Sequence, residues 1–492
     1  MFQGTSSNAG KSLMTAAFCR LLSDRNIAVA PFKAQNMSLN SYVTADGEEI
    51  GRAQALQAAA ARTEPQSSMN PVLLKPTGER ISQVIVRGKP RANMETRAYY
   101  QYKQELISEV RASYDALAEQ YEVIVLEGAG SPGEINLRKY DIVNMSMAGY
   151  AEAPVVLVGD IDRGGVYASF IGHLGVMAEW ERKLVNAFLV NKFRGDESLL
   201  DSAHSYMLSR TGRPVIGVMP WIRDHQLPEE DEVNFDLRYG GLRTPSGEES
   251  PPDDSIVIGV AALPLLSNST DLDPFLREPG IRLVKIDSAE SFKRHRPAGL
   301  IIPGSKNVMA DLRHLQEAGI TEAVKKAVEC GEIVVVGICG GLQMLGHSLY
   351  DPEGVENEPG TRMKGMGLLN INTVLEGEKT LRQTHARFLP TGSEASGYEI
   401  HHGRSNQAAE KELFDIPSLG YRREYVWGTY LHGIFDNNGV RRHFLTEIRR
   451  IAGKESPLLP SLHHSLDEAL DGFAAVFEKN VDVSYMMKLI GY

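Results

Sequence analysis

The sequence predicts an α/β protein with two doubly wound, mostly parallel-sheet domains. Three observations lead to this prediction. Short β-branched runs alternate with helical stretches in both halves, and glycine-rich or charged residues follow the ends of these runs. The periodicity fails between residues 224 and 254, so this stretch divides the chain. At 492 residues, the chain is long enough for each half to bury its own core.

Composition narrows the class of protein. A hydrophobic fraction of 42% and a charged fraction of 23% are those of an ordinary soluble protein. The net charge of −11 argues against nucleic acid as the main partner. Cys19, Cys330 and Cys339 are scattered without metal-ligand spacing, which favours a reducing compartment. Without a membrane-spanning run or a signal-peptide pattern, we expect a cytoplasmic protein without a membrane partner, either monomeric or a homo-oligomer.

The first functional motif is a phosphate-binding loop, residues 4–12, with one residue more than the usual spacing. Its N–H groups would cradle phosphates, Lys11 would reach the β and γ oxygens, and the Ser12 hydroxyl would ligate Mg²⁺. The helix expected over 13–22 would point its N-terminus at the same anion. A glycine-serine loop with a chance lysine is the alternative. The predicted nucleotide contacts are Gly4, Thr5, Gly10, Lys11 and Ser12.

Few residues are left for a strand before this loop. Only residues 1–3 precede the loop, so either the first strand is very short or the chain begins inside a longer protein. Further strands are expected at 27–30, 122–126, 154–158 and 185–190.

Polar residues follow these strands. Lys33 could face a phosphate or a substrate carboxylate, or it could be a surface lysine without a role. Asp46, before a helix expected over 51–61, is either a metal ligand or a helix-initiating acid. Glu127 directly follows a strand, which suits Mg²⁺ or water positioning better than a capping role. Arg163 and Asn191 follow the next two strands.

The predicted domain boundaries follow from these patterns. Residues 1–232 form an ATP-binding domain, 233–254 a linker, 255–440 a second α/β domain and 441–492 a helical extension that serves packing. Strands of the second domain are expected at 256–261, 282–286, 299–302, 333–336 and 426–430.

A cysteine elbow is the main motif of the second domain. The strand expected at 333–336 runs into Gly-Ile-Cys-Gly-Gly, residues 337–341, and a helical pattern follows. This is the plan of a nucleophile elbow, in which a helix N-terminus stabilises a thiolate and later an oxyanion. A buried structural cysteine in a glycine-rich turn is the alternative. After the third strand, Gly304 could supply a second oxyanion donor beside Gly340.

A cysteine nucleophile needs a base or an imidazolium partner. His432 lies at the end of the strand expected over 426–430 and is the favoured candidate. His401 and His402 compete with it, and any one of these histidines could have a purely structural role.

Together these motifs resemble known families. The N-terminal half resembles the dethiobiotin synthetase-like ATPases of the P-loop NTPase type, which share the lengthened loop. The C-terminal half resembles class I glutamine amidotransferases, which share the Gly-x-Cys-x-Gly elbow. Nearly the full length resembles the cobyric acid synthases of cobalamin biosynthesis. The stretches that carry this last resemblance are residues 3–12, 32–40, 127–132, 160–165 and 430–433.

The resemblance implies an activity: ATP- and glutamine-dependent amidation of the b, d, e and g carboxylates of adenosylcobyrinic acid a,c-diamide, giving adenosylcobyric acid. It implies Cys339 as nucleophile and His432 as its base. It also implies Lys11 and Ser12 as ligands of ATP and Mg²⁺, Asp46 and Glu127 as metal ligands, and Asn191 as an adenine contact. Lys33 and Arg163 are candidates for binding the polyanionic corrinoid substrate.

One departure from the amidotransferase pattern leaves the catalytic group open. Many class I enzymes carry an acid two residues after the catalytic histidine, but this position is Ile434. Either Cys339 and His432 form a dyad, or another acid such as Glu399 orients the ring. The alternatives to cobyric acid synthesis are a cobyrinic acid a,c-diamide synthase, a CTP synthetase, which the missing acid disfavours, and a non-catalytic MinD-like nucleotide switch.

Overall fold

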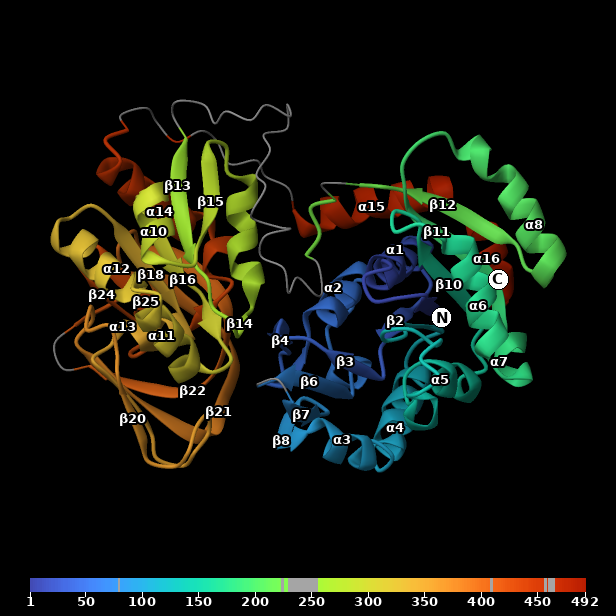
Figure 1. The fold of residues 1–492 in the computed structure, drawn as a ribbon, viewed down its shortest axis with the longest axis horizontal. Coiled ribbons are helices and arrows are strands. Elements are labelled where there is room, and N and C mark those ends of the chain that lie inside the picture. The colour runs from blue at the N-terminus through green and yellow to red at the C-terminus, as the bar shows by residue number, and fades with distance from the viewer. Residues whose placement is uncertain (78–79, 223–224, 229–254, 408–409, 455–457, 459–464) are drawn as a thin grey trace. The chain divides into compact units, whose positions relative to one another are not determined.

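The chain forms two compact units in a computed structural model that describes all residues except 78–79, 223–224, 229–254, 408–409, 455–457 and 459–464 (Figure 1). The first unit comprises Met1–Ser38, Glu48–Asp231 and His464–Tyr492. The second comprises Leu39–Gly47 and Glu232–His463. The chain therefore leaves the first unit after Ser38 and returns to it at Glu48.

The first unit is built on a parallel sheet in the order β2-β9-β1-β10-β11-β12, in which a bridge between Phe2 and Glu127 joins β9 to β1. Although β1 has only three residues, it pairs with β10 in register and lies in the middle of the sheet. The strands are β1 (Phe2–Gly4), β2 (Val29–Phe32), β9 (Val123–Leu126), β10 (Val155–Asp160), β11 (Val185–Phe193) and β12 (Val215–Pro220). Chemistry at the carboxyl ends of such strands is the rule for doubly wound folds.

A smaller sheet, in the order β3-β6-β7-β8, extends this unit. Its strands are β3 (Gln35–Met37), β6 (Val72–Pro76), β7 (Ile81–Val86) and β8 (Lys89–Glu95), and the short β5 (Glu49–Gly51) precedes helix α2. The helices of the unit are α1 (Lys11–Asp24), α2 (Arg52–Ala60), α3 (Thr96–Tyr102), α4 (Ile107–Ala118), α5 (Met145–Tyr150), α6 (Val166–Val176), α7 (Glu179–Leu184), α8 (Asp201–Thr211), α15 (Leu466–Asn480) and α16 (Val483–Leu489).

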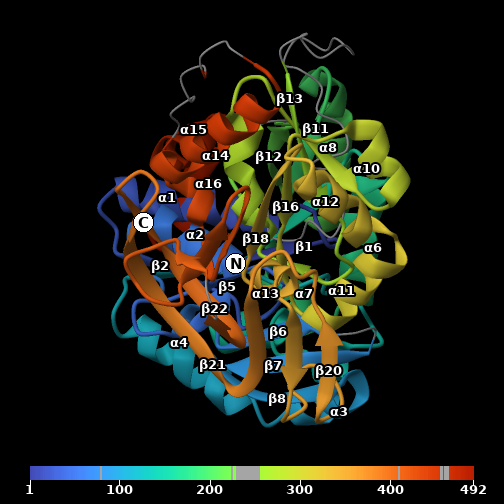
Figure 2. The ribbon, with the colours of Figure 1, turned by 90° about the vertical axis from the view of Figure 1, so that its left-hand side faces the viewer.

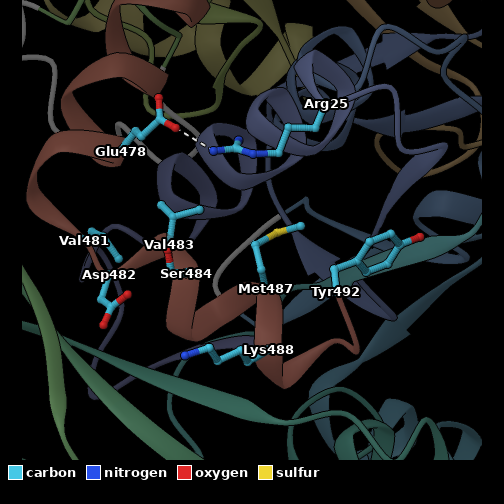
Figure 3. Close-up of a pocket in the computed structure, with 9 residues that line it drawn as sticks. All are labelled: Arg25, Glu478, Val481, Asp482, Val483, Ser484, Met487, Lys488 and Tyr492. Carbon is cyan, nitrogen blue, oxygen red and sulfur yellow. Dashed lines mark hydrogen bonds and ion pairs between the residues drawn. The ribbon is translucent and has the colours of Figure 1, made fainter.

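The two C-terminal helices complete the first unit (Figure 1, red), since α15 packs on α1 and β12 and α16 adds Val483 and Met486 to the same core. Phe473 and Phe477 are buried in the same core as Phe2. The fully buried Arg20 of α1 forms ion pairs with Asp467 and Asp471 of α15. A pocket of about 450 Å³ lies where α15 and α16 meet the end of α1, and the Arg25–Glu478 ion pair closes one side of it (Figure 3).

The second unit contains a seven-stranded sheet in the order β15-β13-β16-β18-β25-β24-β23, parallel from β15 to β25. The last two strands join antiparallel. The strands are β13 (Ile256–Ala261), β15 (Ile281–Ile286), β16 (Gly299–Ile302), β18 (Val334–Ile338), β23 (Lys411–Glu412), β24 (Gly420–Arg423) and β25 (Val426–Thr429). The helices are α10 (Ala289–His295), α11 (Val308–Glu317), α12 (Ile320–Glu329), α13 (Gly340–Leu345) and α14 (Asn438–Ile451).

Two further sheets of this unit carry loops of the site. One has the order β20-β19-β21-β22-β26 and contains a long hairpin of β21 and β22 (Figure 2, orange). The other pairs β14 with β17. The strands are β14 (Leu266–Ser267), β17 (Gly304–Ser305), β19 (Ser348–Asp351), β20 (Thr361–Lys364), β21 (Ile371–Phe388), β22 (Ser393–Gln407) and β26 (Leu431–His432), together with β4 (Ser41–Val43) from the inserted segment.

The predicted fold class is confirmed, and the predicted strands lie within three residues of the observed ones. The division into units differs from the expected boundaries in two places. The expected helical extension is divided, because α14 packs Phe444 into the second core while α15 and α16 join the first. Leu39–Gly47 belongs to the second unit. The expected linker, 233–254, lies outside the described residues. Among the described helices, none has the length and apolarity needed to cross a membrane.

Candidate functional site

The cysteine elbow in the second unit has the predicted geometry. Cys339 stands between β18 and α13 with φ 51° and ψ −105°, a conformation that is strained for a residue with a side chain. Its N–H donates to the Thr429 carbonyl at 2.7 Å, which ties the elbow to the neighbouring strand β25. The glycines make the turn possible, because a Cβ on Gly341 would lie 2.0 Å from the Ile302 carbonyl oxygen.

His432 is the histidine that the fold joins to this cysteine. It is fully buried, hydrogen-bonded to Cys339 and stacked on Tyr398 with ring centroids 5.3 Å apart. Burial opposes the charged ring, but Asp271 and Cys339 outweigh that effect and raise the pKa of His432 to about 10. The ring is therefore an imidazolium when it faces a thiolate.

Asp271 supplies the acid that the sequence left open. Its Oδ2 accepts a hydrogen bond from Nδ1 of His432 at 2.7 Å, and its Oδ1 accepts one from the Gly433 N–H at 2.7 Å. The carboxyl is buried and comes from η4 (Ser269–Arg277), far upstream of the histidine. Cys339, His432 and Asp271 therefore form a triad rather than a dyad. The polar run Asn-Ser-Thr-Asp at 268–271 was the only local signal for this acid, and it resembles an ordinary turn.

Glu399, the acid suggested from the sequence, has other partners. It accepts hydrogen bonds from Arg382 Nε at 2.6 Å and Thr384 Oγ1 at 2.7 Å, and it pairs with His401 at 3.3 Å. Although burial opposes ionisation, these donors lower the pKa of Glu399 to about 2. His401 stacks on Tyr430, so it holds a structural position beside the site.

The other competing histidine also lies in the β21–β22 sheet. His402 Nδ1 is 3.1 Å from the Glu376 carbonyl oxygen. The structure therefore favours His432 over both competitors.

The residues predicted to bind the oxyanion lie at the start of α13 and in β17. A Cβ on Gly340 would lie 3.0 Å from the Ser305 nitrogen, so the two backbones approach closely. The Lys306 N–H donates to the Leu265 carbonyl at 2.9 Å. In the antiparallel pair of β14 and β17, Ser305 lies opposite Leu266 and Gly304 lies opposite Ser267. Hydrogen-bonded and non-hydrogen-bonded pairs alternate along such a pair of strands. The Gly304 N–H therefore points toward β14, and the Ser305 N–H points away from it. This register favours Ser305 over the predicted Gly304 as the donor beside Gly340.

Gly304 has a different role in this arrangement. A Cβ at that position would lie 2.9 Å from the Ser267 carbonyl oxygen and 3.0 Å from Cε1 of His432, so glycine allows this strand to lie close to both. Asp311 of α11 anchors the hairpin, since its carboxyl accepts hydrogen bonds from Ser305 Oγ at 2.5 Å and the Leu265 N–H at 3.1 Å. Burial raises the pKa of Asp311 to about 6.

Replacing Asp271 with asparagine tests the triad. The amide keeps the shape of the side chain but cannot stabilise the imidazolium or hold the Nδ1 proton, so glutamine hydrolysis should fall roughly 10²- to 10⁴-fold. Glutamate release measures this, and Glu399→Gln is the matched control, which should lose far less. A D271N protein with wild-type glutaminase activity would contradict the triad.

The phosphate loop in the first unit forms a closed cradle. Lys11 is buried and its Nζ donates to the carbonyls of Ser6 at 3.0 Å and Gly130 at 3.1 Å. Gly10 has φ +100°, and a Cβ there would lie 2.1 Å from Nδ2 of Asn191. The Asn191 amide donates to the Ala9 carbonyl at 2.9 Å, so it braces the loop from β11. The Thr5 N–H is bound to the Val158 carbonyl at 2.9 Å.

Glu127 is the centre of a buried polar cluster next to the loop. Its Oε1 accepts hydrogen bonds from Ser12 Oγ at 2.8 Å and Lys33 Nζ at 3.0 Å. Gln57 donates to Oε2 at 2.5 Å. The Ser12 hydroxyl and the Glu127 carboxylate are hard oxygen donors, and Mg²⁺ is commonly held by one or two such groups together with nucleotide phosphates. The residues present therefore fit a Mg²⁺-nucleotide.

The structure shows the surroundings of three further predicted residues. Lys33 is buried in its ion pair with Glu127, so it belongs to the phosphate site rather than to a substrate surface. Asp46 is exposed and lies in the segment Leu39–Gly47, which belongs to the second unit, so its role as a metal ligand stays a prediction. Arg163 is mostly exposed after β10 and lies 3.6 Å from the buried Asp160, which Lys192 also contacts at 3.0 Å.

Comparisons with known protein families match the two halves of the chain to two different domains. Residues 1–234 match the CobQ/CobB/MinD/ParA nucleotide binding domain. Residues 257–440 match the CobB/CobQ-like glutamine amidotransferase domain. The two matches contain the phosphate loop and the Cys339 elbow, respectively.

Similarity to individual proteins extends over the whole chain. The cobyric acid synthase of Nitratidesulfovibrio vulgaris is 44% identical over 532 residues, covering 100% of this chain and 97% of that protein. The cobyric acid synthase of Carboxydothermus hydrogenoformans is 43% identical over 504 residues, covering 100% and 99%. The adenosylcobalamin biosynthesis bifunctional protein CobDQ of Leptospira interrogans is 43% identical over 497 residues, and this chain spans 56% of its length. The chain therefore belongs to the cobyric acid synthase family of glutamine-hydrolysing amide ligases.

Proposed function

We propose that this protein converts adenosylcobyrinic acid a,c-diamide to adenosylcobyric acid by amidating its b, d, e and g carboxylates, with glutamine as nitrogen donor and ATP·Mg²⁺ as activator. The observation that carries the proposal is the pairing, on one chain, of a buried Cys339–His432–Asp271 triad with a phosphate loop. Full-length similarity to cobyric acid synthases supports the choice of substrate.

The second unit would generate ammonia. Cys339 Sγ attacks the side-chain amide carbon of glutamine, and the N–H groups of Gly340 and Ser305 stabilise the resulting oxyanion. The carbon–nitrogen bond breaks as the His432 imidazolium gives its proton to the departing ammonia, while Asp271 holds the ring in place. Water then gives a proton to the now neutral ring and attacks the thioester carbon, and the carbon–sulfur bond breaks to release glutamate and restore the Cys339 thiolate beside the His432 imidazolium.

The first unit would activate the substrate. Bound ATP supplies the phosphoryl group that gives each carboxylate a leaving group, since a free carboxylate is inert to ammonia. The loop from Gly4 to Ser12 would hold the phosphates, with Lys11 at the transferring group. Ser12 and Glu127 would hold Mg²⁺, and Lys33 and Gln57 keep the Glu127 carboxylate in place. Arg163 would contact the polyanionic substrate, because its side chain is exposed beyond a strand end.

Product analysis tests the substrate assignment. Purified protein incubated with the a,c-diamide, ATP, Mg²⁺ and glutamine should yield a corrinoid in which four carboxyl groups have become carboxamides, identified by mass spectrometry. A parallel incubation with cobyrinic acid is the control. Amidation of cobyrinic acid at positions a and c, with no change to the diamide, would instead make the protein a diamide synthase.

A further inference from the structure

The segment Leu39–Gly47 comes from the N-terminal half of the chain but is part of the second compact unit. Val43 of β4 is fully buried against Tyr398 and Ile400 of the β21–β22 hairpin. The Gln383 side-chain amide donates to the Val43 carbonyl. Tyr42 packs on Tyr398 with ring centroids 5.7 Å apart, and Tyr398 in turn stacks on His432. The segment is therefore packed into the wall of the glutaminase site.

Two buried residues of the segment hold the turn that precedes the triad acid. Asn40 Oδ1 accepts hydrogen bonds from the Ser269 N–H at 3.0 Å and from Ser269 Oγ at 3.4 Å. The Ser41 N–H donates to Oδ1 of Asn268 at 3.0 Å. Asn268 has a left-handed backbone, with φ 54°, and Ser269 begins η4. These contacts fix the start of the element that presents Asp271.

The turn also reaches His432 directly. Nδ2 of Asn268 lies 3.3 Å from Nε2 of His432. Because its Oδ1 accepts the Ser41 N–H, the Asn268 amide must turn its NH₂ group toward the ring. A donor at Nε2, combined with the Asp271 carboxylate at Nδ1, stabilises the neutral tautomer with the proton on Nδ1. The His432 ring takes this neutral form once it has given its Nε2 proton to the departing ammonia.

We infer that Asn40 and Ser41 are positioning residues of the glutaminase site, supplied by the N-terminal half and acting on His432 through the Asn268–Ser269 turn. The groups that face the ring itself are Asp271, Cys339, Tyr398 and Asn268. The inference rests on the proposed hydrolysis of glutamine at Cys339. It also gives a role to the stretch 32–40, which runs without a break from Lys33 in the phosphate site to Asn40.

Asn40→Ala in the full-length protein tests this inference. Without its acceptor, the turn is no longer held, and we expect glutaminase kcat to fall roughly 10- to 100-fold with KM little changed. Asn40→Asp should recover most of the activity, because a carboxylate keeps the acceptor oxygen at the start of η4, where negative charge is favourable. Ala45→Ser, at an exposed position of the same segment, is the matched control and should behave as wild type.

A second variant guards against a simple folding defect. Asn268→Gly tolerates the left-handed backbone but removes the amide between Ser41 and His432. The Asn268 amide favours the neutral form of the His432 ring, so its loss should favour the imidazolium. An imidazolium stabilises the Cys339 thiolate, which is the form that iodoacetamide alkylates. Alkylation of Cys339 should therefore shift to lower pH. Peptide mass spectrometry would follow Cys339, with the exposed Cys330 as internal reference. Ammonia-dependent amidation should persist in both variants.

The outcomes separate this inference from the proposed function. Wild-type glutaminase kinetics in Asn40→Ala, or an unshifted alkylation profile in Asn268→Gly, would overturn the positioning role while leaving the triad in place. A wild-type protein without glutaminase activity would instead overturn the proposed function, on which the inference rests.

Discussion

Replacing Cys339 with serine should abolish glutamine-dependent amidation while ammonia-dependent amidation survives. The imidazolium of His432, held by Asp271, is matched to a thiolate, and a serine hydroxyl is far too weakly acidic to ionise beside it. Added ammonium salts bypass the hydrolysis step, because the first unit needs only ammonia and an activated carboxylate. The measurement is the yield of amidated corrinoid with glutamine or with ammonium as nitrogen source.

Cys330→Ser is the matched control for this experiment, since it makes the same chemical change at an exposed thiol outside the site. It should retain both activities. A Cys339→Ser protein that still used glutamine would show that the elbow is not the source of the nitrogen. Loss of ammonia-dependent activity as well would mean that the elbow also supports the synthetase unit.

Replacing Lys11 with alanine should remove amidation with both nitrogen sources, by roughly 10²- to 10³-fold or more, because one preorganised charged donor at a reacting centre commonly contributes that much. The ammonium is buried between the carbonyls of Ser6 and Gly130, where it also holds the loop closed. Without an activated carboxylate, neither glutamine-derived nor free ammonia has a substrate. Corrinoid product and released phosphate are the quantities to measure.

Glutamate release separates the two half-reactions in the same variant. Lys11→Ala should still hydrolyse glutamine, because Lys11 belongs to the first unit and the triad to the second. Lys183→Ala removes an exposed lysine from α7 and should leave every activity unchanged. Ammonia-dependent amidation at the wild-type rate in Lys11→Ala would contradict the assignment of the phosphate site.

Both main motifs could be predicted from the sequence because each is local. A phosphate loop and a cysteine elbow are short turns whose glycines, strand before and helix after lie within about fifteen residues of one another. The elbow at 337–341 formed as expected, and Gly10 takes the left-handed conformation that the loop needs. Strand positions were equally accessible, since buried β-branched runs are contiguous in sequence.

The third member of the proposed triad could not be predicted in this way. Asp271 and His432 are separated by 161 residues, and only the topology of the second unit brings the start of η4 to the end of β25. Nothing in the local pattern distinguishes Asp271 from Glu399, which lies near His401 and binds Arg382 instead. In the same way, the sequence left open whether Lys33 faces a phosphate, a substrate carboxylate or solvent, and its burial against Glu127 is visible only in the fold.

By itself, therefore, the sequence determined the two local turns, the elbow at Cys339 and the glycine-rich loop at Gly10, because backbone turns and helix N-termini need only neighbouring residues. The tertiary structure alone decided how each site is completed. A buried charge must find a partner wherever the fold provides one, as His432 does in Asp271 and Glu127 in Lys33. An apolar face likewise packs on whichever core lies open to it, which is why α15 and α16 complete the first unit and Leu39–Gly47 completes the second.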